Sequence, residues 1–180
     1  ADQKAYTLTD PEALALFGAM PTTSGISVGP NSALRVPAVA CAVSLISETI
    51  GSIPAKLHDR ASKKALIDHN AYRLIHDEAN EWTSAAELRT SLTIDALLHG
   101  AGHAQVIRLA DGTPYELHRL EPGKVQINYE PDGEPFYLVS TEAGQTRQSY
   151  RDILRIEAFG GASPISLGRE AIALALSFEG

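Results

Sequence analysis

The apolar residues of this chain change their spacing after Gly102. Before that glycine they recur every three or four residues, which is typical of helices that bury one face. After it they gather in short stretches separated by turn-forming dipeptides, which is typical of strands joined by hairpins. The sequence therefore predicts an α+β fold, in which helices pack on a mostly antiparallel β-meander.

A strong helix is expected between Pro37 and Gly51. Proline suits the first helical turn, where its missing N–H costs no hydrogen bond, and glycine is common where helices end. We therefore expect Gly51 to cap this helix and Pro54 to begin an extended segment over 55–58. The apolar residues at helical spacing are Val39, Val43, Ile46 and Ile50.

Two further helices are predicted before the strands. The shorter one covers about 70–77. The other begins at Ser84, because Ser84 and Glu87 have the spacing of a capping box, in which each side chain accepts a hydrogen bond from the other residue's backbone N–H. We expect this helix to end at Gly100, since the glycines at 100 and 102 mark a junction between helix and strand.

Turn dipeptides mark two hairpins in the second half of the chain. Asp111 and Gly112 separate the expected strands 104–109 and 115–120, because an Asp-Gly pair tolerates the positive φ that tight hairpins need. A second Asp-Gly pair does the same for the two strands that follow. The remaining predicted strands are 124–129, 135–140, 145–150 and 153–156.

The last predicted element is one amphipathic helix over 165–178, with Ser163 as its N-cap and Pro164 at its first position. No capping signal follows it, so we expect the domain to be truncated within this helix. The first residues hold prolines, glycines and a short apolar stretch, and are expected to form an irregular arm with one or two helical turns. The predicted organisation is an extended N-terminal arm, 1–32, and an α+β domain, 33–180.

The composition limits the classes of partner. Apolar residues make up 44% and charged residues 21%, which is typical of an ordered globular domain. The net charge of −7 repels phosphate and argues against tight nucleic-acid binding, although it does not exclude DNA that slides past. No apolar run reaches the roughly 18 residues of a membrane span, so no membrane partner is expected. Cys41, the single cysteine, has small apolar neighbours and is expected to be a buried hydrophobe.

The search for chemical motifs gives one weak candidate. His99 and His103 are four residues apart, a spacing that would place two imidazoles on one helix face and suggests a metal-assisted hydrolase. Glycines at 100 and 102 interrupt that helix, and the glutamate of a His-Glu-x-x-His motif is absent. We therefore predict no catalytic residue, no metal site and no cofactor. A non-ring adaptor or scaffold domain, with the arm as its binding segment, is a further alternative.

The order of these segments resembles the portal proteins of tailed phages of the HK97 type, from about Ser32 onward. No single segment is specific, and the resemblance depends on their shared order. A portal of a phage-derived gene transfer agent is equally compatible. The segments that carry the resemblance are 33–41, 46–54, 69–76, 80–83, 97–100, 104–108, 152–156 and 163–165, together with Asp111, Gly112, Leu117, Leu120, Pro122 and Val125.

The resemblance implies a structural role and no enzymatic activity. Portal proteins form a dodecameric ring at one vertex of the head, and DNA passes through its channel during packaging and ejection, without sequence recognition. The partners implied are identical subunits, the terminase, the head–tail connector and the major capsid protein. The residues matched here would form much of the wing of a subunit that is assembled in the bacterial cytoplasm and resides in the virion. The residues that contact DNA cannot be named from the sequence.

Overall fold

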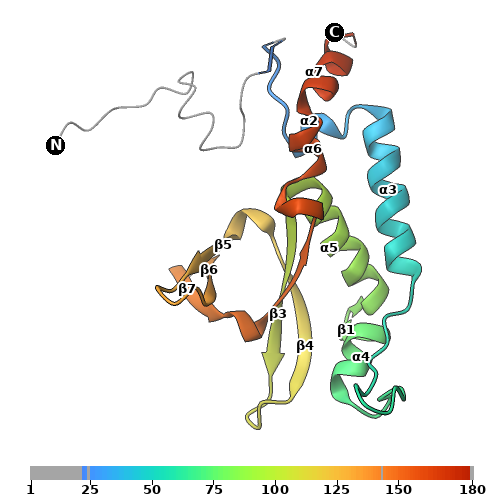
Figure 1. Ribbon diagram of the computed structural model, residues 1–180, viewed down its shortest axis with the longest axis vertical. Helices are drawn as coiled ribbons and strands as arrows, with labels where there is room; N and C mark the ends of the chain where they lie inside the picture. The colour runs from blue at the N-terminus through green and yellow to red at the C-terminus, as the bar shows by residue number, and fades with distance from the viewer. Residues whose placement is uncertain (1–21, 24, 143, 179–180) are drawn as a thin grey trace, which may run out of the picture.

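The computed structural model describes residues 22, 23, 25–142 and 144–178 (Figure 1). The α-helices in this part of the chain are α2 (Pro30–Ala33), α3 (Pro37–Ser52), α4 (Asn70–His76), α5 (Ala85–His99), α6 (Pro164–Leu167) and α7 (Arg169–Ser177). The strands are β1 (Glu78–Asn80), β2 (Thr83–Ser84), β3 (Ala101–Arg108), β4 (Pro114–Leu120), β5 (Val125–Tyr129), β6 (Pro135–Thr141), β7 (Gly144–Ser149) and β8 (Ile153–Glu157). Short 3₁₀ helices are η1 (Pro122–Lys124), η2 (Tyr150–Asp152) and η3 (Phe159–Gly161). The predicted α+β class is confirmed.

The longer strands form two separate three-stranded sheets, and β1 and β2 form a small hairpin. The first sheet has the order β4-β3-β8, and the second has the order β5-β6-β7. All of these pairs are antiparallel, as predicted. β8 does not continue the second sheet but returns to β3, where Ile156 lies opposite Gly102. The spacing of apolar residues gave no signal for this division into two sheets.

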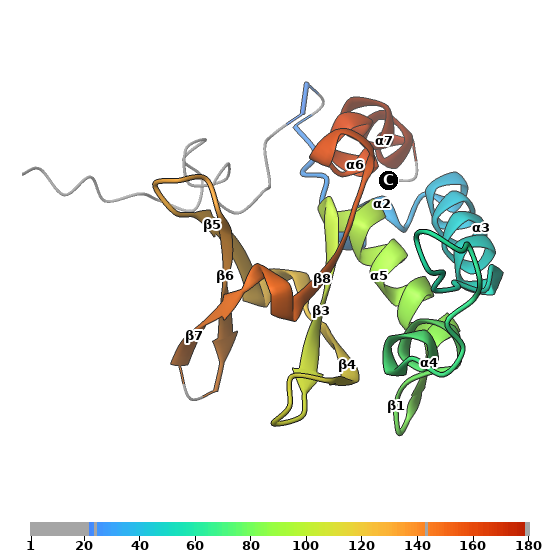
Figure 2. The same ribbon diagram turned by 60° about the horizontal axis from the view of Figure 1, so that its bottom comes forward.

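Helix α5 is the centre of the fold. It lies between α3 and the first sheet, and the second sheet lies on the other side of the first (Figures 1 and 2). Different parts of α5 enter two apolar clusters, because Leu88 and Leu92 pack with residues of α4, β3 and β4, whereas Leu98 packs with residues of α2, α3, α6 and α7. The helix therefore joins the two halves of the core.

The prediction that Gly51 caps helix α3 is wrong. Gly51 does not cap the helix, which continues to Ser52 with Ile53 as its C-cap. Gly51 is buried, and a Cβ on it would collide with the Oγ1 atom of Thr90 on α5. The glycine therefore allows α3 to lie close against α5 at Thr90. Residues 54–57, where an extended segment was predicted, form no strand, and His58 pairs with Ala65 in an isolated antiparallel bridge.

The prediction that Cys41 is buried is also wrong, because its side chain is exposed. Val43 is buried against the core. Cys41 precedes it by two residues and is therefore rotated by about 200° around the helix, which places it on the opposite face. Small apolar neighbours in the sequence did not distinguish the two faces of α3.

The predicted helix over 165–178 is interrupted. α6 ends at Leu167, and α7 begins at Arg169, so that Gly168 alone separates them. The backbone of Gly168 has φ −91° and ψ 10°, outside the helical values. The apolar residues that we assigned to more than one face of a single helix therefore belong to two short helices separated by Gly168.

The predicted arm lies partly outside the described residues, including its apolar stretch 13–17. Of the described part, Val28 is buried in the cluster that contains Leu98. The backbone N–H and hydroxyl of Thr23 both donate to the carboxylate of Glu170 on α7, at 3.2 and 2.8 Å. These contacts attach the chain to α7 before α2 begins. The division of the chain at residue 32 remains a prediction.

Candidate functional site

The capping box and the hairpin turn lie on the periphery of the fold. Ser84 is the N-cap of α5, where its hydroxyl accepts from the N–H of Glu87 at 3.1 Å and its own N–H donates to the Glu87 carboxylate at 2.9 Å. The backbone N–H and the hydroxyl of Ser84 both donate to the Glu87 carboxylate, and these two hydrogen bonds lower the pKa of that carboxyl. Gly112 has φ 84° in the β3–β4 turn, where the carboxylate of Asp111 accepts from the N–H of Thr113. Both motifs stabilise elements of the fold and offer no reactive group.

The end of α5 meets the start of α6 in a tight junction. Gly100 caps α5 with a left-handed backbone of φ 95°. Ser163 is the N-cap residue of α6, with Pro164 at the first position, but its side chain makes no capping bond to α6. Its buried hydroxyl instead lies 2.8 Å from the carbonyl oxygen of Leu97 and 3.0 Å from that of Leu98. Ser163 therefore satisfies backbone carbonyls at the end of α5.

The structure places His99 and His103 in different surroundings. His99 is the last residue of α5 and is exposed. His103 lies on β3, is 8% exposed, and faces the ring of Tyr137 on β6 with 5.6 Å between ring centroids. The two imidazoles therefore do not share a helix face, and the arrangement does not favour the hydrolase alternative.

His103 fills the space between the two sheets. Burial lowers its pKa, and the nearby positive charge of Arg155 lowers it further, whereas the carboxylate of Asp95 acts in the opposite direction. Its pairing partner on β8 is Arg155. Among the described residues, neither Nδ1 of His103 nor Nε of Arg155 has a hydrogen-bond partner. A neutral ring packed edge-on against Tyr137 serves as a contact between the sheets.

An ion pair with a buried carboxylate links α5 to the first sheet. The Asp95 side chain is 3% exposed, and its two carboxylate oxygens accept from Nε and Nη2 of Arg119 at 2.7 and 2.6 Å. The hydrogen bonds to Asp95 raise the pKa of Arg119. This pair was not among the predicted sites. The available signal was a single carboxylate between Ile94 and Ala96 in an apolar stretch of the helix.

The other histidines have local partners. His58 and His69 are exposed, and their Nδ1 atoms bond to backbone groups nearby. His76 and His118 are partly buried and lie beside the carboxylates of Asp77 and Glu116. Within the described residues, no group of three or more histidine, cysteine, aspartate or glutamate side chains is placed to hold a metal ion.

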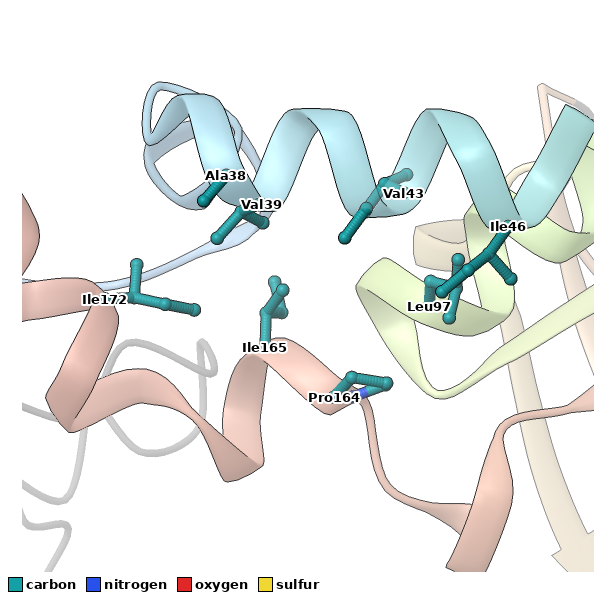
Figure 3. Close-up of a pocket in the computed structure, with 9 residues that line it drawn as sticks. Ala38, Val39, Val43, Ile46, Leu97, Pro164, Ile165 and Ile172 are labelled. Atoms are coloured by element: carbon teal, nitrogen blue, oxygen red, sulfur yellow. The ribbon is translucent and has the colours of Figure 1, made fainter.

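The most distinctive concave feature is apolar. A groove of about 290 Å³ lies between α3, the end of α5, α6 and α7 (Figure 3). Val39 and Val43 of α3 face Ile172 of α7 and Ile165 of α6 across it (Figure 3). The remaining lining residues are Ala38, Ala42, Ile46, Leu97 and Pro164. Such a lining provides no polar group to orient a small substrate, and it suits contact with another apolar surface. None of the helices described is long and apolar enough to cross a membrane.

Comparison with known proteins agrees with the resemblance seen in the sequence. The family model for phage portal protein matches residues 37–180. The portal protein of Enterobacteria phage HK97 is 22% identical over 162 residues, which make up 85% of this chain and 38% of that protein.

Solved structures share the fold. The neck of an empty gene transfer agent particle, computed with C6 symmetry, contains a chain of 24% identity and TM-score 0.66, with 96% of this chain and 49% of that chain covered. The neck of a native gene transfer agent particle, computed with C12 symmetry, gives 22% identity, TM-score 0.63, and coverage of 92% and 49%. An HK97-family phage portal protein from Corynebacterium diphtheriae gives 15% identity, TM-score 0.53, and coverage of 82% and 46%. The chain spans less than half the length of these relatives.

Proposed function

This chain belongs to the phage portal protein family, and we propose that it is part of a portal subunit that assembles with identical copies into a ring at the head vertex. The observation that carries the proposal is the match to the family model over residues 37–180. Relatives of the same fold occur in the necks of particles whose structures were computed with C6 and C12 symmetry. A dodecamer is the assembly proposed here.

The fold suits a structural role. A central helix joins two apolar clusters. The buried side chains of Asp95 and Ser163 form hydrogen bonds with other elements of the fold. A rigid body of this kind holds the same shape in every copy, which a closed ring of repeated contacts requires. Residues 33–180 would form much of the wing, and residues 1–32 an extended arm.

The proposed ring has a channel through which DNA passes during packaging and ejection. The net charge of −7 supports passage without adhesion, because acidic surfaces repel phosphate. The proposed partners are the terminase during packaging, the head–tail connector afterwards, and the major capsid protein around the vertex. Assembly would take place in the bacterial cytoplasm, and the ring would remain in the virion or in a gene transfer agent particle.

Electron microscopy of the complete polypeptide tests the proposal. We expect annular particles of uniform diameter in negative stain. A monomer under all salt and concentration conditions would contradict the proposal and favour the adaptor alternative. A variant that lacks residues 1–21 separates the role of the arm from that of the folded body. It is better designed than a deletion to residue 32, which would also remove the buried side chain of Val28.

A further inference from the structure

Helix α3 has an unusual composition for a helix at the surface. Glu48 is the only charged residue among its sixteen. Large apolar side chains are nevertheless exposed, namely Leu45 by 66%, Ile46 by 43% and Ile50 by 41%, followed by Ile53 by 58%. We call Ala42, Leu45, Ile46, Ile50 and Ile53 the α3 surface.

The α3 surface begins beside the face by which the helix attaches to the fold and continues onto the outer side of the helix. α3 packs on the rest of the chain through its buried residues Val43, Ser47 and Gly51. Ile46 and Ile50 border these buried residues, about 60° and 20° from Val43 around the helix, whereas Leu45 lies about 160° away on the outer side. In both views α3 forms one flank of the molecule, with α5 between it and the sheets (Figures 1 and 2). An outward helix face in a free soluble protein is normally polar.

The apolar groove extends the α3 surface. Ala42 and Ile46 belong to both, so that the groove opens onto the exposed side of the helix (Figure 3). A helix of sixteen residues is roughly 24 Å long. Contiguous apolar areas of this extent usually mark a protein contact. The groove would receive side chains of whatever covers the helix.

We propose that the α3 surface binds a second copy of this chain and forms one side of the contact between neighbouring subunits. The inference rests on the proposed function, because a closed ring of identical copies needs a lateral contact on each flank. The near absence of charge on α3 favours an apolar partner surface. In a ring of more than two copies the contact joins two different faces, so α3 of one copy meets a surface other than α3 of the next.

Cys41 provides a test without any substitution. It lies one helical turn before Leu45 and is exposed in the single chain. Rings and free subunits of the complete polypeptide are separated by size-exclusion chromatography and treated with N-ethylmaleimide, and the peptide that contains Cys41 is analysed by mass spectrometry. We expect modification in free subunits and loss of modification in rings. Equal modification in both would overturn the inference. Protection in both would do so too, because the rest of the same polypeptide would then cover α3.

A pair of variants gives an independent test. Leu45→Glu introduces a charge on the α3 surface, and Leu109→Glu introduces one at an exposed leucine that follows β3, 47% exposed. We expect Leu45→Glu to abolish the ring peak, with an unchanged circular dichroism spectrum, and Leu109→Glu to retain the ring. Equal retention or equal loss of rings in the two variants would refute the α3 contact. Failure of the unmodified polypeptide to form rings would instead refute the proposed function.

Discussion

Arg119 on β4 holds the buried carboxylate of Asp95 on α5 with two hydrogen bonds of 2.7 and 2.6 Å. The two partners are unequally buried, since the side chain of Arg119 is 42% exposed and that of Asp95 only 3%. The pair joins the central helix to the edge strand of the first sheet. Loss of the arginine leaves a charge inside the protein, whereas loss of the aspartate leaves a charge that can reach water.

We therefore expect Arg119→Met to be the more damaging change. An unpaired buried carboxylate should lower the free energy of unfolding by about 3 kcal/mol. Asp95→Asn should cost less, because the amide oxygen still accepts from the guanidinium group and no buried charge remains. Urea unfolding of both variants measures the difference. Equal destabilisation, or a smaller effect of Arg119→Met, would contradict this reading of the pair.

Gly102 allows β3 to lie directly on α5. A Cβ at this position would collide with the carbonyl oxygen of Leu92 and lie 2.8 Å from its carbonyl carbon. Because backbone atoms cannot move aside easily, Gly102→Ala should lower the free energy of unfolding by roughly 2–3 kcal/mol. Gly123→Ala is the matched control, since a Cβ there has no heavy atom within 4 Å. Urea midpoints of the two variants should differ clearly, and similar midpoints would show that β3 and α5 can separate at low cost.

Features determined by neighbouring residues were predictable from the sequence. The capping box of Ser84 and Glu87 and the turn at Gly112 depend on residue types within three positions of each other. The helix-to-strand change at Gly100 follows from local backbone preference. The family resemblance also used only the order of such local segments.

Features determined by distant residues were not predictable. Asp95 and Arg119 are 24 positions apart, and nothing in their spacing indicates a pair. The return of β8 to β3 depends on contacts between strands separated by four others in the chain. The errors at Gly51 and Cys41 both concern the side of α3 that meets α5, where Gly51 lies against Thr90. With apolar or small residues on nearly every side of α3, the spacing that indicated Val43 did not distinguish the covered side from the exposed one.

The hydroxyl of Ser163 connects the start of α6 to the end of α5, 65 residues earlier. Ser163→Ala leaves the carbonyls of Leu97 and Leu98 without this buried donor and should lower the free energy of unfolding by about 1–2 kcal/mol. Ser177→Ala is the control, because its exposed hydroxyl bonds only within its own helix, to Leu174. The melting temperatures of the two variants measure the difference, and Ser163→Ala should have the lower one. A loss no greater than that of the control would mean that water replaces the Ser163 hydroxyl.

His103 should make the stability of the fold depend on pH. Burial holds its pKa below the ordinary 6.5, whereas the unfolded chain restores the ordinary value. As the pH falls through 6.5 the unfolded chain therefore binds a proton that the folded protein does not, and the free energy of unfolding decreases. Above that pH the residue has no such effect. The sign is opposite to that of a histidine that gains an acidic partner on folding.

The variant His103→Phe isolates this contribution. It keeps an aromatic ring against Tyr137 and removes the titrating group, while the other histidines remain in both proteins. Urea unfolding from about pH 7.5 down to about pH 5.5 should then show a steeper loss of stability for the original protein than for the variant. Only in the original protein must folding either remove a proton from His103 or bury its charged ring. Parallel pH profiles would show that His103 is protonated as easily in the folded protein as in the unfolded chain, and that the space between the sheets admits water.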